Sequence, residues 1–303
     1  MKLLVSLNNK KVDDYLNYTN SFILGLKDFS INYLEFDLNE IKELLNNYKD
    51  IELFISLNGN YFNKDLKDLE KNIIELSKLP IKGIMFYDLA VLEIVKRNNL
   101  NVNLCWHQEH MVNNYNTCNY YLDKGCNYAY LTSDITTDEI IEISEKSKIN
   151  LISFFYGHPM ISFSKRSLIT NYFLFNKKKK EKDVYTITSK DSDGYYILEN
   201  SHGTEILTEK VLNGIMPFSK LKDKLSYGVL DEQFTDHDTF IKILSVFCDL
   251  LNNKINSDEA NDKVYDLCGS KDTMFFDIKT IYKVKNNEKK NWIIKSCRGL
   301  RKT

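Results

Sequence analysis

The sequence has only four arginines and 11 glycines among its 303 residues. The guanidinium group is the side chain that grips phosphate or carboxylate with two parallel hydrogen bonds, so recognition of that kind is scarce here. No GxGxxG or Walker loop occurs, and this excludes the common glycine-rich cradles for nucleotide phosphates. No GxSxG turn occurs either, so the sequence gives no support to a serine nucleophile.

Long apolar runs and closely paired cysteines are also missing. No stretch reaches the roughly 18–20 apolar residues that span a bilayer, and the apolar run at the start is too short for a signal peptide. We therefore expect a cytoplasmic protein without membrane contact. The six cysteines form no CxxC pair and no zinc-ribbon spacing, so we expect free thiols in the interior.

The charges nearly cancel, with 41 Lys and Arg against 42 Asp and Glu and a net charge of −1. A protein that mainly coats nucleic acid needs a basic excess. RNA is therefore a possible partner that the overall charge does not indicate, although a local basic patch is still allowed. The run KKKKEK at 177–182 is expected to be solvated.

Short apolar runs alternate with amphipathic segments over the first 160 residues. The runs are nearly continuous, as in strands that are buried on both faces. Helical periodicity between these runs predicts helices at 39–48, 65–79 and 137–147. We expect Asn39 to cap the first of them. This alternation predicts parallel pairing, in a doubly wound sheet or a barrel. The first seven expected strands are 2–7, 21–26, 51–57, 81–87, 101–107, 128–132 and 150–156.

The alternation breaks after Gly157. The Asp193-Gly194 pair between the apolar runs 184–188 and 195–199 predicts a β-hairpin. We interpret the segment from about residue 165 to 225 as an antiparallel insertion after the seventh strand.

The alternation then resumes with an eighth strand at 227–231 and an amphipathic helix at 236–252. The predicted fold is thus an α/β protein, a TIM-like (β/α)₈ barrel over residues 1–255 with a β insertion. Residues 256–303 are expected to form a C-terminal extension packed on the barrel.

In a parallel barrel the active site lies at the C-terminal ends of the strands, because every βα loop converges there. Polar residues follow six of the expected strands. Loops are polar in any protein, so no single residue is decisive, but the set is larger than a plain scaffold requires. Its members are Asn58, Asn60, Asp88, His107, Gln108, Glu109, His110, Asn113, Asn114, Ser133, Asp134, Tyr156, His158, Asp231 and Glu232.

The densest polar stretch is WHQEHMVNN at 106–114. His107 and His110 with Glu109 between them suggest a metal site. The spacing differs from both HExxH and HxxEH, and no second cluster of His or Cys supplies further ligands. We expect no metal site, and metal binding by the two histidines stays an alternative.

Three segments, taken together, resemble the peptidase U32 family. His107-Gln108 with Asn113 is similar to that family's STQ-x₄-N segment after a barrel strand. The stretch LTSDITTDEI at 131–140 is similar to the family's L-x-R-E-L-S-x-x-E-I. Each motif is weak by itself, whereas their order and spacing make the match more specific.

The third segment is Phe155-Tyr156-Gly157 followed by Arg166 and Ser167, which is similar to the family's F-x-[HY]-G and S-x-R-C signature. Asp88 also matches an aspartate after the family's preceding strand. The resemblance covers roughly residues 1–255.

The sequence departs from the family at chemically important positions. Ser167 stands at the signature cysteine, and Ser133-Asp134 replaces an Arg-Glu pair. Family members that support oxygen-independent hydroxylation hold an iron–sulfur cluster on four cysteines. Because the signature cysteine is missing and no tight cysteine cluster replaces it, we expect no iron–sulfur cluster and no other cofactor.

The resemblance implies a hydrolase that acts on a peptide or a small molecule. In that case His107 or Asp134 would be the catalytic general base for a water molecule. Arg166 would orient a substrate carboxylate. The substrate-binding residues implied by the match are Asp88, Gln108, Asn113, Tyr156 and Arg166.

Two alternatives stay open. The first is an RNA- or metabolite-modification factor of the hydroxylation type, which would bind an aromatic or carboxylate-bearing small molecule. The second is a non-catalytic partner that forms a heterodimer with a longer U32 protein. The missing signature cysteine favours the partner role over the modification role.

Overall fold

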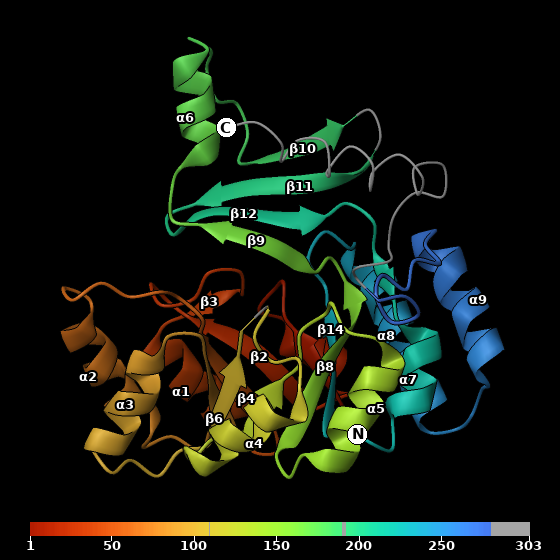
Figure 1. Cartoon of the computed structure of the whole chain (residues 1–303), viewed down its shortest axis with the longest axis horizontal. Helices are drawn as coiled ribbons and strands as arrows, with labels where there is room; N and C mark the ends of the chain where they lie inside the picture. The colour runs from red at the N-terminus through yellow and green to blue at the C-terminus, as the bar shows by residue number, and fades with distance from the viewer. Residues whose placement is uncertain (109, 190–191, 280–303) are drawn as a thin grey trace, which may run out of the picture.

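The computed structural model describes residues 1–108, 110–189 and 192–279. Eight parallel strands close into a barrel in the order β1-β14-β8-β7-β6-β5-β4-β2, and β1 pairs with β2 to complete the ring (Figure 1). The predicted TIM-like barrel is therefore confirmed. The strands are Lys2–Ser6 (β1), Ser21–Leu26 (β2), Glu52–Leu57 (β4), Gly83–Phe86 (β5), Leu104–His107 (β6), Tyr128–Tyr130 (β7), Asn150–Gly157 (β8) and Tyr227–Asp231 (β14).

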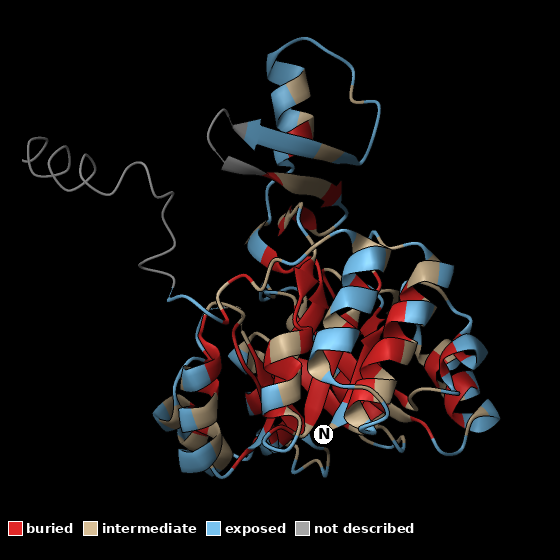
Figure 2. Cartoon of the chain, turned by 90° about the vertical axis from the view of Figure 1, so that its right-hand side faces the viewer, coloured by how far each residue is buried: buried red, intermediate tan, exposed pale blue. Residues whose placement is uncertain are grey.

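Helices cover the outside of the barrel, and their buried faces meet the strands (Figure 2). Asp37 caps the first of them and forms a capping box with Glu40, so the cap lies two residues before the expected Asn39. Thr136 and Glu139 form the same box at α5. The helices are α1 (Leu38–Asn47), α2 (Leu66–Leu76), α3 (Leu89–Arg97), α4 (Tyr115–Asp123), α5 (Thr137–Lys146), α7 (Ile215–Leu221) and α8 (His237–Leu251), with a 3₁₀ turn η1 (Val12–Tyr15) after β1 and a short strand β3 (Glu35–Phe36) beside β2.

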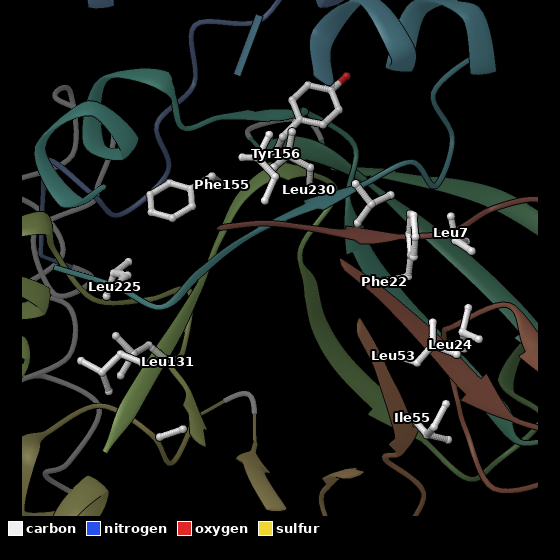
Figure 3. Packing of buried hydrophobic residues seen from close by; sticks show 14 of the residues in the cluster. Leu7, Phe22, Leu24, Leu53, Ile55, Leu131, Phe155, Tyr156, Leu225 and Leu230 are labelled. Carbon is white, nitrogen blue, oxygen red and sulfur yellow. The ribbon is translucent and has the colours of Figure 1, made fainter. Parts of the chain in front are cut away.

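Side chains alternate between the two faces of the barrel wall, because successive residues of a strand point to opposite sides. One buried cluster fills the barrel interior and takes residues such as Leu4, Phe54 and Cys105 from different strands. A larger cluster lies between the strands and the helices, where Figure 3 shows part of its packing. The inward positions therefore form layers that end at the C-terminal mouth.

A four-stranded antiparallel sheet in the order β10-β11-β12-β9 interrupts the barrel after β8 and stands above the mouth (Figure 1). The sheet begins at Met160, five residues before the expected start of the insertion. The segment 215–221, which we placed in the insertion, instead belongs to the barrel layer, because Phe218 packs against Phe155 and Phe247. The elements are β9 (Met160–Ser164), α6 (Leu168–Phe175), β10 (Val184–Ser189), β11 (Ser192–Asn200) and β12 (Gly203–Thr208), followed by a two-residue strand β13 (Leu212–Asn213) that pairs with β8.

Two polar contacts tie the insertion to the barrel loops beneath it. The Asn200 side-chain amide donates to the Ile31 carbonyl at 3.1 Å. His202 Nε2 lies 2.9 Å from a carboxylate oxygen of Glu35. The two contacts hold the end of β11 and the turn after it against the loop after β2 and against β3.

The chain beyond β14 lies against the outside of the barrel. Helix α9 (Ser257–Cys268) buries Ala260 and Val264 and packs on α8 and α7. The amide of Thr137 donates to the Phe276 carbonyl at 2.8 Å. The expected extension runs to residue 303, and residues 280–303 lie outside the described part. None of the helices that the structure describes is long and apolar enough to cross a membrane.

Candidate active site

A cavity of about 50 Å³ lies at the C-terminal mouth of the barrel. Its barrel side is built from the last inward positions of the strands, one layer above the apolar interior. The opposite side comes from the segment that links β8 to the insertion. The polar and aromatic lining residues are Ser6, Asn32, Tyr33, His107, Gln108, Tyr130, Thr132, Ser133, Phe154, His158 and Asp231.

His107 points into this cavity because it follows the inward Cys105 by two residues on β6. Its ring stacks on Tyr130, with 4.1 Å between the ring centroids. Burial lowers the pKa of His107 to about 4, so the imidazole is neutral at pH 7. Its Nδ1 is buried and has no hydrogen-bond partner among the described residues.

Asp231 reaches the cavity from the end of β14, two residues after the inward Val229. Its carboxyl group lies deep among protein atoms although the residue is partly open to solvent, and this burial raises its pKa to about 6. Hydrogen bonds from the Gln233 amide and the Ser6 hydroxyl act in the opposite direction without cancelling the effect of burial. A carboxyl group of this kind can take or give a proton close to neutral pH.

His158 completes the polar set from the insertion side. Its Nδ1 lies 2.9 Å from the Thr208 carbonyl, and this geometry assigns the proton to Nδ1 and leaves Nε2 as an acceptor. The ring packs between Tyr196 and Phe234. Burial lowers the pKa of His158, so the site combines two neutral imidazoles with one readily protonated carboxyl.

Of the residues expected from the sequence, His107 and Gln108 line the cavity. Asp134 lies outside the lining, where it accepts a hydrogen bond from the Thr132 hydroxyl at 2.5 Å and stands 3.9 Å from His110. Asn113 is exposed, and its side-chain oxygen accepts from Asn114. The end of β6 thus gives the cavity His107 and Gln108, whereas His110, Asn113 and Asn114 are exposed.

Asp88, Tyr156 and Arg166 also lie outside the cavity lining. Asp88 caps α3 by accepting from the Ala90 amide at 3.0 Å, and it accepts from the Tyr61 amide at 3.1 Å. Tyr156 is fully buried on the outer face of β8, with its hydroxyl 3.3 Å from Thr235. Arg166 is exposed on the insertion. Of the seven site residues expected from the sequence, only His107 and Gln108 therefore line the cavity.

Asp231 and His158 line the cavity, and both belong to the strand-end polar set, but neither was expected to be catalytic or to bind substrate. For Asp231 a signal exists, because it continues the inward alternation of Tyr227 and Val229 to the strand end. For His158 the sequence shows only that it follows a strand, since its place in the cavity depends on how the insertion leaves β8.

The described cysteines do not form a set that fits a four-thiolate cluster. Cys105 lies inside the barrel, Cys118 and Cys126 are buried near α4, and Cys248 and Cys268 lie on α8 and α9. Over residues 1–108, 110–189 and 192–279, no three His, Cys, Asp or Glu side chains gather in a way that would hold a metal ion. Ser167, at the signature position, directly precedes α6 on the insertion.

A second and wider cleft, of about 610 Å³, lies between the insertion and the loops after β2 and β4. Its lining includes Phe29, Tyr61, Phe62 and Phe163 together with acidic and basic side chains. Lys165 Nζ stands 3.7 Å from the centre of the Phe62 ring, a cation–π contact that joins the insertion to the barrel.

Two proteins of Bacillus subtilis (strain 168) are similar in sequence. tRNA hydroxylation protein P2 is 26% identical over 185 residues, which cover 59% of this chain and 59% of that protein. tRNA hydroxylation protein P1 is 23% identical over 148 residues, covering 49% of this chain and 35% of that protein. The matched part is thus less than two thirds of either relative.

Solved structures are similar at a more distant level. The U32 peptidase Mk0906 has a TM-score of 0.42 and 10% identity, over 52% of this chain and 70% of its own. A mutant tryptophan synthase α-subunit from Pyrococcus furiosus has a TM-score of 0.40 and 12% identity, over 89% and 97%.

The family model described as Peptidase family U32 matches residues 10–289, which is most of the chain. The match includes the insertion and every barrel strand except β1, which ends at Ser6. The chain belongs to peptidase family U32.

Proposed function

We propose that this chain takes part in tRNA hydroxylation and that the cavity at the barrel mouth binds a small polar molecule for that reaction. The similarity to two proteins named for tRNA hydroxylation supports the process. The main support for a binding site at the barrel mouth is the cavity itself, which His107, His158 and Asp231 line.

The size of the cavity restricts what it can hold. A water molecule needs about 10–15 Å³ of such space, so a cavity of about 50 Å³ takes a group of a few heavy atoms. An extended peptide does not fit inside it. A small molecule, or one functional group of a larger molecule, does.

The lining residues have complementary roles toward such a group. The imidazole rings of His107 and His158 line the cavity, and burial keeps both of them uncharged. Asp231 moves a proton at near-neutral pH, because burial raises its pKa to about 6. This arrangement suits binding and proton transfer at a carboxylate or carbonyl oxygen.

No set of cysteines among the described residues fits a four-thiolate iron–sulfur cluster. With Ser167 at the signature position, we propose that this chain holds no iron–sulfur cluster of its own. Anaerobically purified protein should contain no stoichiometric iron and sulfide. Finding both would refute the proposal.

Peptide hydrolysis is the second candidate, and the observation that favours it is Asp231. A carboxyl group with a pKa of about 6 is a suitable general base for water, the role that we expected of Asp134. Turnover of a peptide mixture by the purified chain, lost in Asp231→Asn, would establish this candidate. No turnover at any pH between 5 and 8 would remove it.

We further propose a second U32 chain as the working partner, since two U32-type relatives in one organism, P1 and P2, carry names for the same process. Affinity-tagged protein from its own cells should bring down such a chain. Recovery of the tagged chain as a fully active monomer would contradict this.

Deletion of the gene tests the proposed process directly. Nucleosides from the tRNA of the deletion strain should lack a species that is heavier than its parent by one oxygen, and the wild-type gene should restore it. Unchanged tRNA nucleosides in the deletion strain would show that the process is different.

A further inference from the structure

Helix α6 presents aromatic side chains to solvent on its outer face. Tyr172 is 60% exposed and Phe175 is 88% exposed. The inner face already has its packing partners, because Ile169 is buried and Phe173 packs on Tyr185 at 5.2 Å between ring centroids. The outer aromatic residues are therefore available to something that is not part of the insertion.

The helix is held firmly in this position. The Thr170 amide donates to the buried Glu199 carboxylate at 3.0 Å, and the Thr170 hydroxyl donates to the same group. The Leu168 amide donates to the Thr204 hydroxyl at 2.9 Å. These bonds connect the first turn of α6 to β11 and β12, so the exposed face is a fixed platform.

A local excess of positive charge adjoins this face. Residues 165–182 contain seven Lys and Arg and one acidic residue, in a chain whose net charge is −1. Lys180 is already paired with Glu199 and Asp183. Lys177, Lys178 and Lys179, directly after α6, are exposed, and no acidic side chain in the described part of the chain pairs with them.

We propose that the outer face of α6 and the lysines 177–179 form an RNA-docking surface. Bases of an unpaired tRNA segment would stack on Tyr172 and Phe175, and the lysines would neutralise its phosphates. The insertion stands above the barrel mouth, so RNA held there is on the same side as the cavity (Figure 1). This inference rests on the proposed role in tRNA hydroxylation.

The composition of the surface favours RNA over a protein partner. Protein interfaces are depleted in lysine, particularly at their centre. Single-stranded nucleic acid is bound by aromatic platforms beside basic side chains, which is the combination found here.

Binding of a fluorescent, in vitro transcribed tRNA to the full chain tests the surface at several salt concentrations. Lys177→Gln/Lys178→Gln/Lys179→Gln should weaken binding and reduce the slope of log affinity against log salt by about 2, since each lost phosphate contact on a single strand removes about 0.7. Tyr172→Ala/Phe175→Ala should weaken binding about tenfold or more and leave that slope unchanged.

The matched control is Lys67→Gln/Lys71→Gln/Lys148→Gln, which removes three exposed lysines from the barrel exterior. It should bind like the wild type. If the 177–179 variant binds tRNA as tightly as the wild type, the proposed docking surface is wrong. It is also wrong if the control variant loses as much tRNA affinity as the 177–179 variant. If the wild type binds tRNA and neither α6 variant changes it, the docking surface is wrong while the proposed function stands. If the wild type binds no tRNA and gene deletion leaves the tRNA nucleosides unchanged, both the docking surface and the proposed function are wrong.

Discussion

At the scale of single residues, His107 makes folding stability depend on pH. Its pKa falls to about 4 on burial, below its ordinary value of 6.5. The unfolded chain therefore binds a proton between these values that the folded chain does not. The stability associated with neutral His107 is full above pH 6.5 and declines as the pH falls toward 4.

Replacement of His107 by Phe should remove this part of the pH dependence, because the ring is kept against Tyr130 while the titrating group is lost. Denaturant unfolding at pH 7 and pH 5 measures it. The free energy of unfolding should fall less between these pH values in His107→Phe than in the wild type. The same fall in both proteins would mean that His107 is protonated as easily in the folded state.

Tyr156 is a second residue whose role the structure assigns to packing. It is fully buried against Phe240 and Phe247. Tyr156→Ala should lower the free energy of unfolding by about 3–5 kcal/mol. Tyr156→Phe should lower it by about 1 kcal/mol or less, since the single hydroxyl contact is 3.3 Å long. If Tyr156→Phe kept its stability and lost tRNA hydroxylation, Tyr156 would belong to the site.

The position of Tyr156 also shows what alternation in the sequence can and cannot predict. On β14, Tyr227, Val229 and Asp231 follow a strict two-residue period, so the inward direction of Asp231 is readable from the sequence. On β8, Ile152 and Phe154 pair in register with β14, but Leu230 then pairs with Tyr156 and not with Phe155. This bulge turns Tyr156 outward, and no residue type marks it in advance.

At the scale of elements, the attachment of α6 depends on Glu199. This carboxylate is 7% exposed and accepts hydrogen bonds from Thr170 and Lys180. Glu199→Ala should speed amide hydrogen exchange in residues 168–175 by about tenfold, because hydrogen bonds to charged groups contribute about 1.5–3 kcal/mol. Exchange in β14 should not change.

The exposed Glu181→Ala variant is the control for this measurement. It should exchange like the wild type in both segments. An unaltered α6 in Glu199→Ala would show that packing of Ile169 and Phe173 is sufficient to hold the helix.

The elements of the barrel were more predictable than those of the insertion. Most barrel strands are buried apolar runs that an amphipathic helix follows in the sequence, so the pattern predicts where they lie. Helix α6 has apolar residues on most sides and lacks a helical period, and α7 lies in a stretch that we interpreted as antiparallel. Arg166 was expected to bind a substrate carboxylate, but the chain enters β9 at Met160 and places Arg166, exposed, between β9 and α6.

At the scale of the whole molecule, a charged cluster at the N-terminal end of the barrel joins several strands. Glu52 accepts from Lys82 and Lys2, each at 2.9 Å, and from Tyr227 at 2.8 Å. Burial by itself would raise the pKa of Glu52, but these bonds and one from Ser21 outweigh it and lower the pKa to about 2. The cluster connects β4, β1 and β14 across the closure of the barrel.

Glu52→Gln should destabilise the barrel by about 1–2 kcal/mol, since it leaves the partly buried Lys82 without its counterion and removes the charged acceptor of the Tyr227 hydroxyl. The stabilisation from Glu52 is present above its ordinary pKa of 4.5 and is lost as the pH falls toward 2. Thermal unfolding at pH 7 and pH 3 measures both effects. The variant and the wild type should differ less at pH 3, and an equal difference at both pH values would contradict the assigned charge state.

The central claim is that the cavity at the barrel mouth is the working site, and one comparison of two carboxylates tests it most directly. Asp231 lines the cavity, whereas Asp88 caps α3 outside the lining, and asparagine is an equally good cap. Asp231→Asn and Asp88→Asn are expressed in the deletion strain, and tRNA nucleosides are measured by mass spectrometry. The account predicts that Asp88→Asn restores the hydroxylated nucleoside and that Asp231→Asn, equally abundant and folded, does not. Full restoration by Asp231→Asn would contradict it.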